Sequence, residues 1–170
     1  MSRRLPVYIL IDTSGSMKGE PIESVKVGLS DMIASLRLDP YALETACISI
    51  ITYDKEVNMG SREQKGDWMP LLFVLTDGKP SDLMVYEEAI NNVKRHQFTN
   101  IVACAAGPKA KTEPLKKLTD NVFTLDTMDS STFKKFFQWV TINVQQGGRT
   151  MGVTDSVELP PPPIEVNCVI

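Results

Sequence analysis

LPVYILIDTSGSM, residues 5–17, is the stretch that decides the fold. Its first seven residues form an apolar run that is too short for a helix and typical of a strand covered on both faces. Asp12, Ser14 and Ser16 follow directly, with Gly15 between the two serines. A carboxylate and two hydroxyls are hard oxygen ligands, and the carboxyl end of a buried parallel strand is where open α/β sheets bind their ligands. The pattern therefore predicts a divalent-cation site at this edge of a sheet.

These residues also have an ordinary structural interpretation. Asp, Ser and Gly are common in strand-to-helix turns, and Ser16 could simply cap the next helix. That helix is predicted to begin near Pro21 and to stop at Asp39 and Pro40. Apolar residues recur along it at helical spacing: Ile22, Val25, Leu29, Met32, Ile33 and Leu36. The buried strand before the polar residues and the amphipathic helix after them favour the cation site.

Strand-like runs alternate with helical patterns along the rest of the chain. Strands are predicted at residues 45–52, 70–76, 101–106 and 122–125, and helices from about residue 81, at 113–119 with Thr112 as its cap, and from Ser130 or Ser131. This alternation predicts the α/β class, with a doubly wound, mostly parallel central sheet and helices on both faces.

The end of the chain differs in composition from the rest. Residues 1–147 are predicted to form the domain, and residues 148–170 a proline-rich tail with four consecutive prolines at 160–163. Residues 164–170 are apolar enough for a strand. They are expected either to dock on the sheet edge or on a neighbouring molecule, or to form a disordered terminus.

One connection does not fit the alternation. No helical pattern lies between Thr52 and Pro70, although two parallel strands need a crossover and each of the others has a helix. An extended chain could span the distance but could not cover the sheet face that it crosses. Either something else closes that face, or a segment of the molecule is absent from the sequence.

Composition and charge exclude several classes of protein. The chain of 170 residues is 42% hydrophobic and 23% charged, which is typical of a globular protein, and its net charge of −3 does not favour nucleic acid or an anionic membrane. No apolar run is long enough to span a bilayer, and Asp12 interrupts the N-terminal apolar stretch before it could serve as a signal peptide. Cys47, Cys104 and Cys168 lack metal-type spacing, and the first two are expected to be buried. A cytoplasmic location is expected.

The combined motifs resemble a von Willebrand factor type A domain, and more specifically the bacterial TerY-type tellurium-resistance proteins. The resemblance runs from about Arg4 to Val144. It rests on the opening stretch, on Leu-Thr-Asp-Gly at 75–78, and on the segments RLPVY (4–8), GEPI (19–22), LET (43–45), EQKGDW (63–68) and FFQWV (136–140).

The resemblance implies a metal-ion-dependent adhesion site with Asp12, Ser14, Ser16 and Asp77 as its residues. Mg²⁺ is the expected cation, with Mn²⁺ or Ca²⁺ as alternatives, and Asp77 is expected to act through water. The family also supplies a threonine from a second loop, but this sequence has no matching stretch. A segment that carries the threonine is therefore expected to be missing near residues 57–61, and Thr52 does not replace it.

A site with few carboxylates leaves the cation most of its positive charge, so an acidic side chain of another protein is the expected partner. By resemblance, the setting is tellurium resistance and stress response, and the expected partners are other tellurium-resistance components, such as a membrane protein or an associated kinase and phosphatase. Neither nucleic acid nor direct membrane insertion is expected.

Two alternatives to this binding module remain at the level of the sequence. One is a metal-assisted phosphohydrolase, although Ser14 stands where haloacid-dehalogenase-type phosphatases have a second Asp, and no phosphate-binding loop or nucleophile elbow occurs. The single histidine, His96, lies beside Lys94 and Arg95 at a polar helix end, so no catalytic residue is assigned. The other alternative is a metal-free scaffold that acts through its helices and the proline tail.

Overall fold

A computed structural model describes residues 3–53, 67–77, 80, 83–150 and 158–169. The strands are β1 (Leu5–Asp12), β2 (Ala46–Tyr53), β3 (Leu71–Thr76), β4 (Asn100–Ala106), β5 (Val122–Leu125) and β6 (Val166–Cys168). The helices are the 3-10 turn η1 (Gly15–Met17), α1 (Glu20–Leu38), α2 (Pro40–Thr45), α3 (Leu83–Arg95), α4 (Glu113–Lys116) and α5 (Ser130–Thr150).

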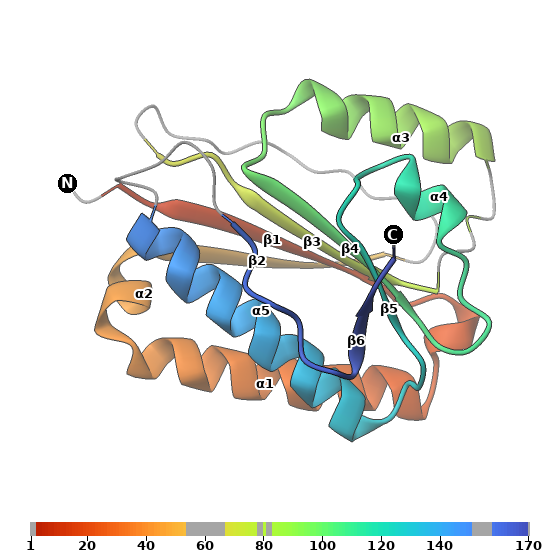
Figure 1. The fold of residues 1–170 in the computed structure, drawn as a ribbon, viewed down its shortest axis with the longest axis horizontal. Coiled ribbons are helices and arrows are strands. Elements are labelled where there is room, and N and C mark those ends of the chain that lie inside the picture. The colour runs from red at the N-terminus through yellow and green to blue at the C-terminus, as the bar shows by residue number, and fades with distance from the viewer. Residues whose placement is uncertain (1–2, 54–66, 78–79, 81–82, 151–157, 170) are drawn as a thin grey trace.

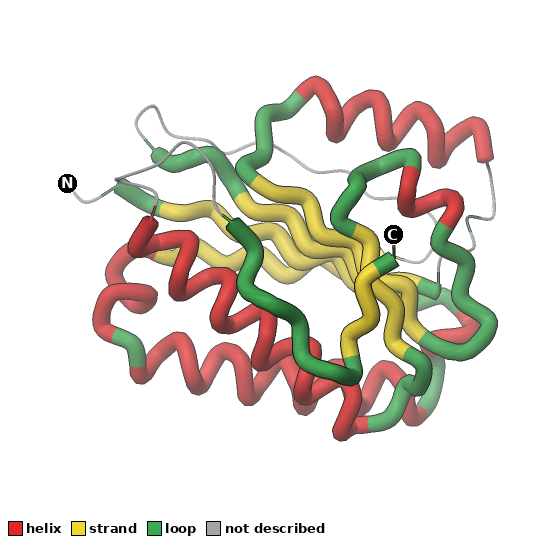
Figure 2. The backbone as a smooth tube through the Cα atoms, viewed as in Figure 1, coloured by secondary structure: helices red, strands yellow, loops and turns green. Residues whose placement is uncertain are grey.

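The strands form one sheet in the order β2-β1-β3-β4-β5-β6, parallel except for β6, which is antiparallel to β5. Helices α1, α2 and α5 cover one face, while α3 and α4 lie over the other (Figure 1). Figure 2 shows the sheet between these two layers of helices. The doubly wound, mostly parallel α/β fold predicted from the sequence is therefore confirmed, and its type is that of von Willebrand A-like and Rossmann-like domains.

Alternation along the central strands divides the core between the two faces. In β1, the side chains of Leu5, Val7, Ile9 and Ile11 pack into the cluster beneath α1 and α5, while Leu10 packs into the cluster on the other face. Both faces are apolar because both are covered, which explains why the strand reads as a nearly continuous hydrophobic run.

Helices α1 and α5 pack closely where Gly28 faces the aromatic side of α5. A Cβ atom at Gly28 would lie 2.5 Å from Phe137 Cδ2 and 3.3 Å from the Phe133 carbonyl oxygen. The missing side chain is therefore what lets α1 approach Phe133 and Phe137, both of which are buried.

The sequence pattern does not predict the short helix α2, because Asp39 and Pro40 indicate the end of α1. They do end α1, but Asp39 also begins α2: its side chain accepts hydrogen bonds from the backbone N–H groups of Tyr41 and Ala42. Pro40 occupies the first turn, where a missing N–H costs nothing. The residues that end α1 therefore also begin α2, so the pattern that marks the end of one helix does not reveal the start of the next.

The expected helix caps need two corrections. Neither Ser130 nor Ser131 caps α5; Asp129 does, accepting the backbone N–H of Thr132 at 2.9 Å. That hydrogen bond, together with one from the Thr127 hydroxyl, lowers the pKa of Asp129, so this cap persists to a lower pH than an ordinary Asp would allow. Thr112 precedes α4 as expected, but its side chain makes no capping hydrogen bond, and α4 ends earlier than predicted, at Lys116.

Cys47 is exposed, contrary to the expectation, whereas Cys104 is buried as expected. The reason is position: Cys47 lies on β2 at the end of the sheet, while Cys104 lies on β4 between two other strands. An apolar run in the sequence does not distinguish an edge strand from a central one.

The tail docks on the sheet edge, which is one of the alternatives that the sequence left open. Val166, Asn167 and Cys168 pair with β5 in antiparallel register. Upstream, the buried Trp139 of α5 donates its indole N–H to the Pro160 carbonyl at 3.0 Å. Helix α5 continues beyond residue 147 to Thr150.

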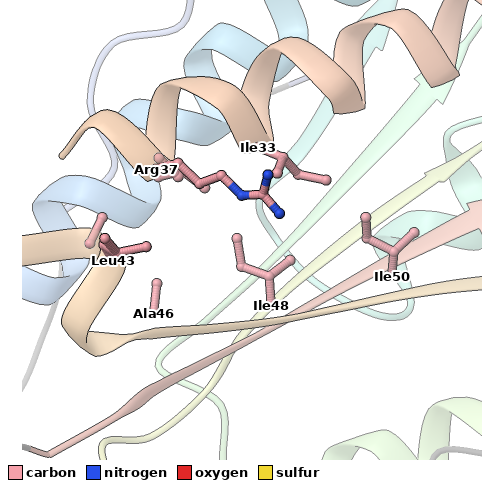
Figure 3. A pocket seen from close by; sticks show the side chains of 8 residues that line it. Ile33, Arg37, Leu43, Ala46, Ile48 and Ile50 are labelled. Atoms are coloured by element: carbon pink, nitrogen blue, oxygen red, sulfur yellow. The ribbon is translucent and has the colours of Figure 1, made fainter. Parts of the chain in front are cut away.

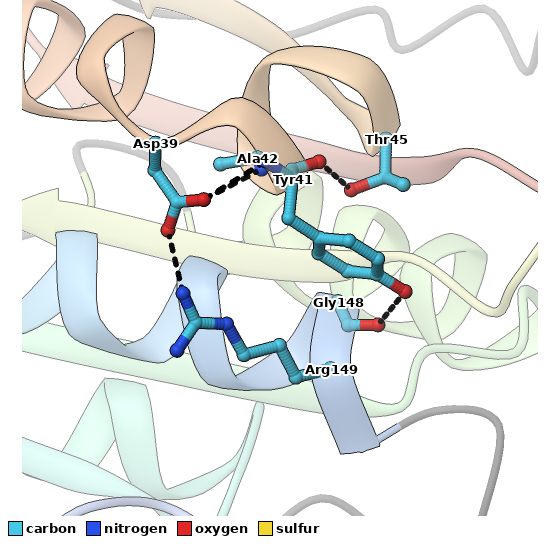
Figure 4. A network of polar contacts seen from close by, with 6 residues as sticks. All are labelled: Asp39, Tyr41, Ala42, Thr45, Gly148 and Arg149. Carbon is cyan, nitrogen blue, oxygen red and sulfur yellow. Dashed lines mark hydrogen bonds and ion pairs between the residues drawn. The ribbon is translucent and has the colours of Figure 1, made fainter.

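A polar network fastens α2 to the end of α5 (Figure 4). Arg149 Nη2 lies 3.1 Å from Asp39 Oδ2, and the Tyr41 hydroxyl donates to the Gly148 carbonyl at 2.9 Å. The Thr45 hydroxyl donates to the Tyr41 carbonyl within α2. Asp39 is thus both a helix cap and one half of an ion pair.

Replacing Asp39 by Ala is expected to lower the free energy of unfolding by about 1 kcal/mol, the usual cost of losing an N-cap. Asp39→Asn is the matched control, because its amide oxygen still caps α2 while the charge opposite Arg149 is lost. Since Arg149 is largely exposed, we expect Asn to retain most of the stability. Urea denaturation measures both; equal losses for Ala and Asn would mean that the ion pair, and not the cap, stabilises this region.

Candidate functional site

The candidate site lies where β1 and β3 end side by side. These strands are parallel neighbours, so Asp12 at the end of β1 and Asp77 just after β3 reach the same carboxyl edge of the sheet. Both carboxylates are buried, with 5% of Asp12 and 7% of Asp77 exposed. The loop after β1 is fixed to β2 because Thr13 donates both its backbone N–H and its hydroxyl to the Tyr53 carbonyl.

Both oxygens of the Asp12 carboxylate are positioned by neutral donors. The backbone N–H of Ser14 donates to Oδ1 at 2.8 Å, and the Thr76 hydroxyl donates to Oδ2 at 2.7 Å. No lysine or arginine in the described part of the chain forms an ion pair with Asp12. A carboxylate offers about four lone-pair sites, so each oxygen retains capacity for another ligand.

Ser16 connects the loop after β1 to the loop after β3. Its hydroxyl donates to Asp77 Oδ2 at 2.6 Å, a short charge-assisted hydrogen bond. Because the hydroxyl proton goes to Asp77, the lone pairs of Ser16 Oγ stay available to an electrophile. The backbone N–H of Lys111 donates to the Asp77 carbonyl, so the residues before α4 also hold this loop in place.

Asp12, Ser14, Ser16 and Asp77 therefore fit a divalent cation by the chemistry of their donor atoms. Two hydrogen bonds hold these side chains in place, from the Ser14 N–H to Asp12 and from the Ser16 hydroxyl to Asp77. No group of three or more His, Cys, Asp or Glu side chains gathers anywhere in the described residues, so a cation here depends on the serine hydroxyls. A donor set of this kind suits Mg²⁺, Mn²⁺ or Ca²⁺ and not a soft metal.

The sequence did not single out two residues that support the site. Thr76 is the last residue of β3 and directly precedes Asp77, and its hydroxyl orients Asp12. The signal in the sequence was a threonine at the carboxyl end of an otherwise apolar strand. Tyr53, at the end of β2, contributes its carbonyl to Thr13. Burial, and after it the negative charge of Asp12, raises the pKa of the Tyr53 hydroxyl, which therefore stays neutral.

The expected gap near residues 57–61 lies outside the described residues, as do residues 54–66 of the connection between β2 and β3. Thr52 is on β2, opposite Ile11 in the register, with an exposed side chain. No described contact joins Thr52 to Asp12 or Asp77.

No protein-family profile matches the chain, and no curated protein matches it. Among solved structures it is similar to proximal thread matrix protein 1 from the mussel byssus, seen in two structures. One superposes with a TM-score of 0.61 at 12% identity over 85% of this chain, and the other with a TM-score of 0.59 at 13% identity over 82%.

The chain spans about half the length of the mussel protein, 48% and 46% in the two structures. At this identity the likeness shows the fold alone, a doubly wound, von Willebrand A-like arrangement. None of the helices in the described residues is both long and apolar enough to cross a membrane.

Proposed function

We propose that this protein is a non-enzymatic, divalent-cation-dependent protein-binding module. Asp12, Ser14 and Ser16 would hold the cation directly, and Asp77 would support it through Ser16 and water. When bound there, the cation supplies an open coordination position for the carboxylate of an Asp or Glu side chain on another protein. Mg²⁺ is the proposed resident ion.

One observation carries the proposal. Both oxygens of the buried Asp12 carboxylate are held in place by hydrogen bonds from neutral donors, next to the Ser16–Asp77 hydrogen bond. Burying a charge is costly unless a partner of opposite charge offsets it. A cation at Asp12 would offset that cost. Because the serines are neutral, the bound ion would keep a positive charge to attract an outside carboxylate.

The proposed setting is the cytoplasm and a tellurium-resistance or related stress response, with other components of that system as partners. This part of the proposal rests on the sequence resemblance to TerY-type proteins and on the von Willebrand A-like fold. Fold similarity alone does not assign a function, so the partner has to be tested directly.

Capture of tellurium-resistance proteins on the immobilised full chain should require Mg²⁺ and should be lost in EDTA. Ser14→Ala should lose at least about nine-tenths of the captured protein, because Ser14 Oγ is a proposed ligand while its backbone N–H still orients Asp12. Ser35→Ala is the matched control, since Ser35 is an exposed serine on α1 whose hydroxyl bonds only its own helix backbone in the described contacts.

Capture that is indifferent to EDTA and to Ser14→Ala would support a metal-free scaffold instead. Mg²⁺-dependent hydrolysis of p-nitrophenyl phosphate that disappears in Asp12→Asn would contradict the non-enzymatic assignment. The two assays therefore separate the three classes of function.

A further inference from the structure

The outer edge of β2 lacks the features that normally protect the end of a sheet. In the part of the chain that the structure describes, β2 pairs with β1 on its inner side and with no strand on its outer side. Its eight residues, Ala46–Tyr53, include no charge and no proline. Natural sheet edges are usually guarded by charges, prolines or very short strands, because an open ladder templates pairing with another chain.

The opposite edge of the same sheet is guarded. There β6, Val166–Cys168, is only three residues long and follows the four prolines at 160–163. The two edges of the sheet therefore differ: the β6 edge carries features that protect it from pairing with another chain, and the β2 edge does not.

The direction of the backbone groups on β2 follows from one hydrogen bond. The Tyr53 carbonyl accepts the N–H of Thr13, so the backbone groups of Tyr53 face β1. Because these groups alternate along a strand, Cys47, Ser49 and Ile51 also face β1. The N–H and C=O groups that face outward therefore belong to the other residues: Ala46, Ile48, Ile50 and Thr52.

An apolar groove of about 310 Å³ lies along this edge, between α1 and β2 (Figure 3). It is lined by Ile33, Leu36, Arg37, Ala42, Leu43, Ala46, Ile48 and Ile50. Leu43 is 65% exposed and Ile50 is 40% exposed. For scale, an apolar cavity of about 150 Å³ is enough to hold benzene. The groove therefore offers room for side chains that reach across the edge.

We propose that this edge binds a second copy of the same chain, with the two β2 strands antiparallel about a two-fold axis at Ser49. That centre makes hydrogen-bonded pairs of Ala46 with Thr52 of the second copy and of Ile48 with Ile50 of the second copy. The two-fold axis generates each of these pairs twice, which makes about four pairs. At two hydrogen bonds per pair, about eight hydrogen bonds form between the two strands. A two-fold axis at Ile50 would form only about six hydrogen bonds between the β2 strands of the two copies.

The chemistry of the edge favours a second copy over a different protein strand. A two-fold axis normal to the sheet keeps each face continuous, so the two apolar grooves join and cover Leu43 and Ile50 of both copies. Because β2 is uncharged, no like charges meet at the axis. A charged partner strand would find no complementary charge along β2 and would bury its own.

Sedimentation of the full chain in EDTA tests the proposal, since EDTA excludes assembly through a metal. The wild type should sediment as a dimer of the 18.9-kDa chain. Ile50→Lys should raise the dissociation constant at least tenfold by placing two charges at the edge. Ile142→Lys, at a residue of α5 with a similar exposure of 43%, should leave the dimer intact. A monomeric wild type, or a dimer unchanged by Ile50→Lys, would overturn the proposal.

Cross-linking keeps the proposal testable even if Ile50→Lys fails to fold. In a Cys47→Ser, Cys168→Ser background, Ser49→Cys places two thiols on the axis, at a non-hydrogen-bonded pair. The Cα atoms of such a pair lie about 4.5 Å apart, which is within the range that a disulfide spans. Oxidised glutathione should convert Ser49→Cys to a covalent dimer at least tenfold faster than Asn167→Cys, which lies at the guarded edge. Equal rates at the two edges would refute pairing through β2.

Discussion

Asp12→Asn is expected to weaken Mn²⁺ and Mg²⁺ binding by at least about 100-fold, to the point where calorimetry records no saturable heat. Losing a group that merely supports a ligand costs 10–100-fold in metal affinity, so losing the charged ligand itself should cost at least the upper end of that range. The substitution is nearly isosteric, and the amide oxygen can still accept the Ser14 N–H, so the fold should be preserved.

Thr76→Val should give an intermediate loss of about 10-fold to 100-fold, because Asp12 keeps its charge but loses the hydroxyl that orients Oδ2. Thr76→Ser restores that hydroxyl and should restore most of the affinity. The cation affinity is thus expected to be lowest in Asp12→Asn, intermediate in Thr76→Val and near the wild-type value in Thr76→Ser. This order distinguishes a specific cation site from nonspecific attraction of cations to acidic side chains.

Asp126→Asn is the matched control for Asp12→Asn, since Asp126 is an exposed Asp just after β5. It removes the same charge from the chain and should leave the affinity unchanged. If wild-type protein takes up no divalent cation, or if Asp12→Asn binds as tightly as wild type, the proposed cation site is wrong and the fold assignment alone stands.

Trp139→Ala is expected to lower the free energy of unfolding by about 3–5 kcal/mol, the range for truncating a buried large aromatic side chain. Trp139 is 2% exposed and meets Phe123 edge-on, with ring centroids 4.8 Å apart. It also donates to the Pro160 carbonyl, so the truncation should release the tail and with it β6. Guanidinium denaturation measures the stability.

Limited proteolysis near Pro160 should separate the two effects of that change, because cleavage should become faster in Trp139→Ala under conditions where the domain is still folded. The control is Gln138→Ala at the adjacent exposed position, where a change within about 0.5 kcal/mol is expected. A loss of stability with no faster cleavage would show that Trp139 supports the core but not the tail.

Much of the site could be predicted because its residues follow a local rule. Asp12, Ser14 and Ser16 sit directly after a buried strand, and Asp77 follows another, so a parallel sheet must bring them to one edge. The role of Thr76 was missed since its partner Asp12 is distant in the sequence, and a threonine at the end of a strand has no pattern of its own. Metal binding itself stays a prediction.

The same reasoning explains the errors in the fold. Cys47 was expected to be buried because its strand reads as apolar, yet strand order, which the sequence does not encode locally, puts β2 at the end of the sheet. Helix α2 was hidden because Asp39 ends one helix and caps the next.

The sequence by itself determined the α/β class, most strand and helix positions and the polar residues at the strand ends, because hydrophobic periodicity and turn chemistry are properties of neighbouring residues. Only the tertiary structure decided which strands lie at the edges, where the tail docks and which hydroxyl reaches which carboxylate. Those features depend on contacts between residues far apart in the chain, and such contacts form only when the whole sheet is assembled.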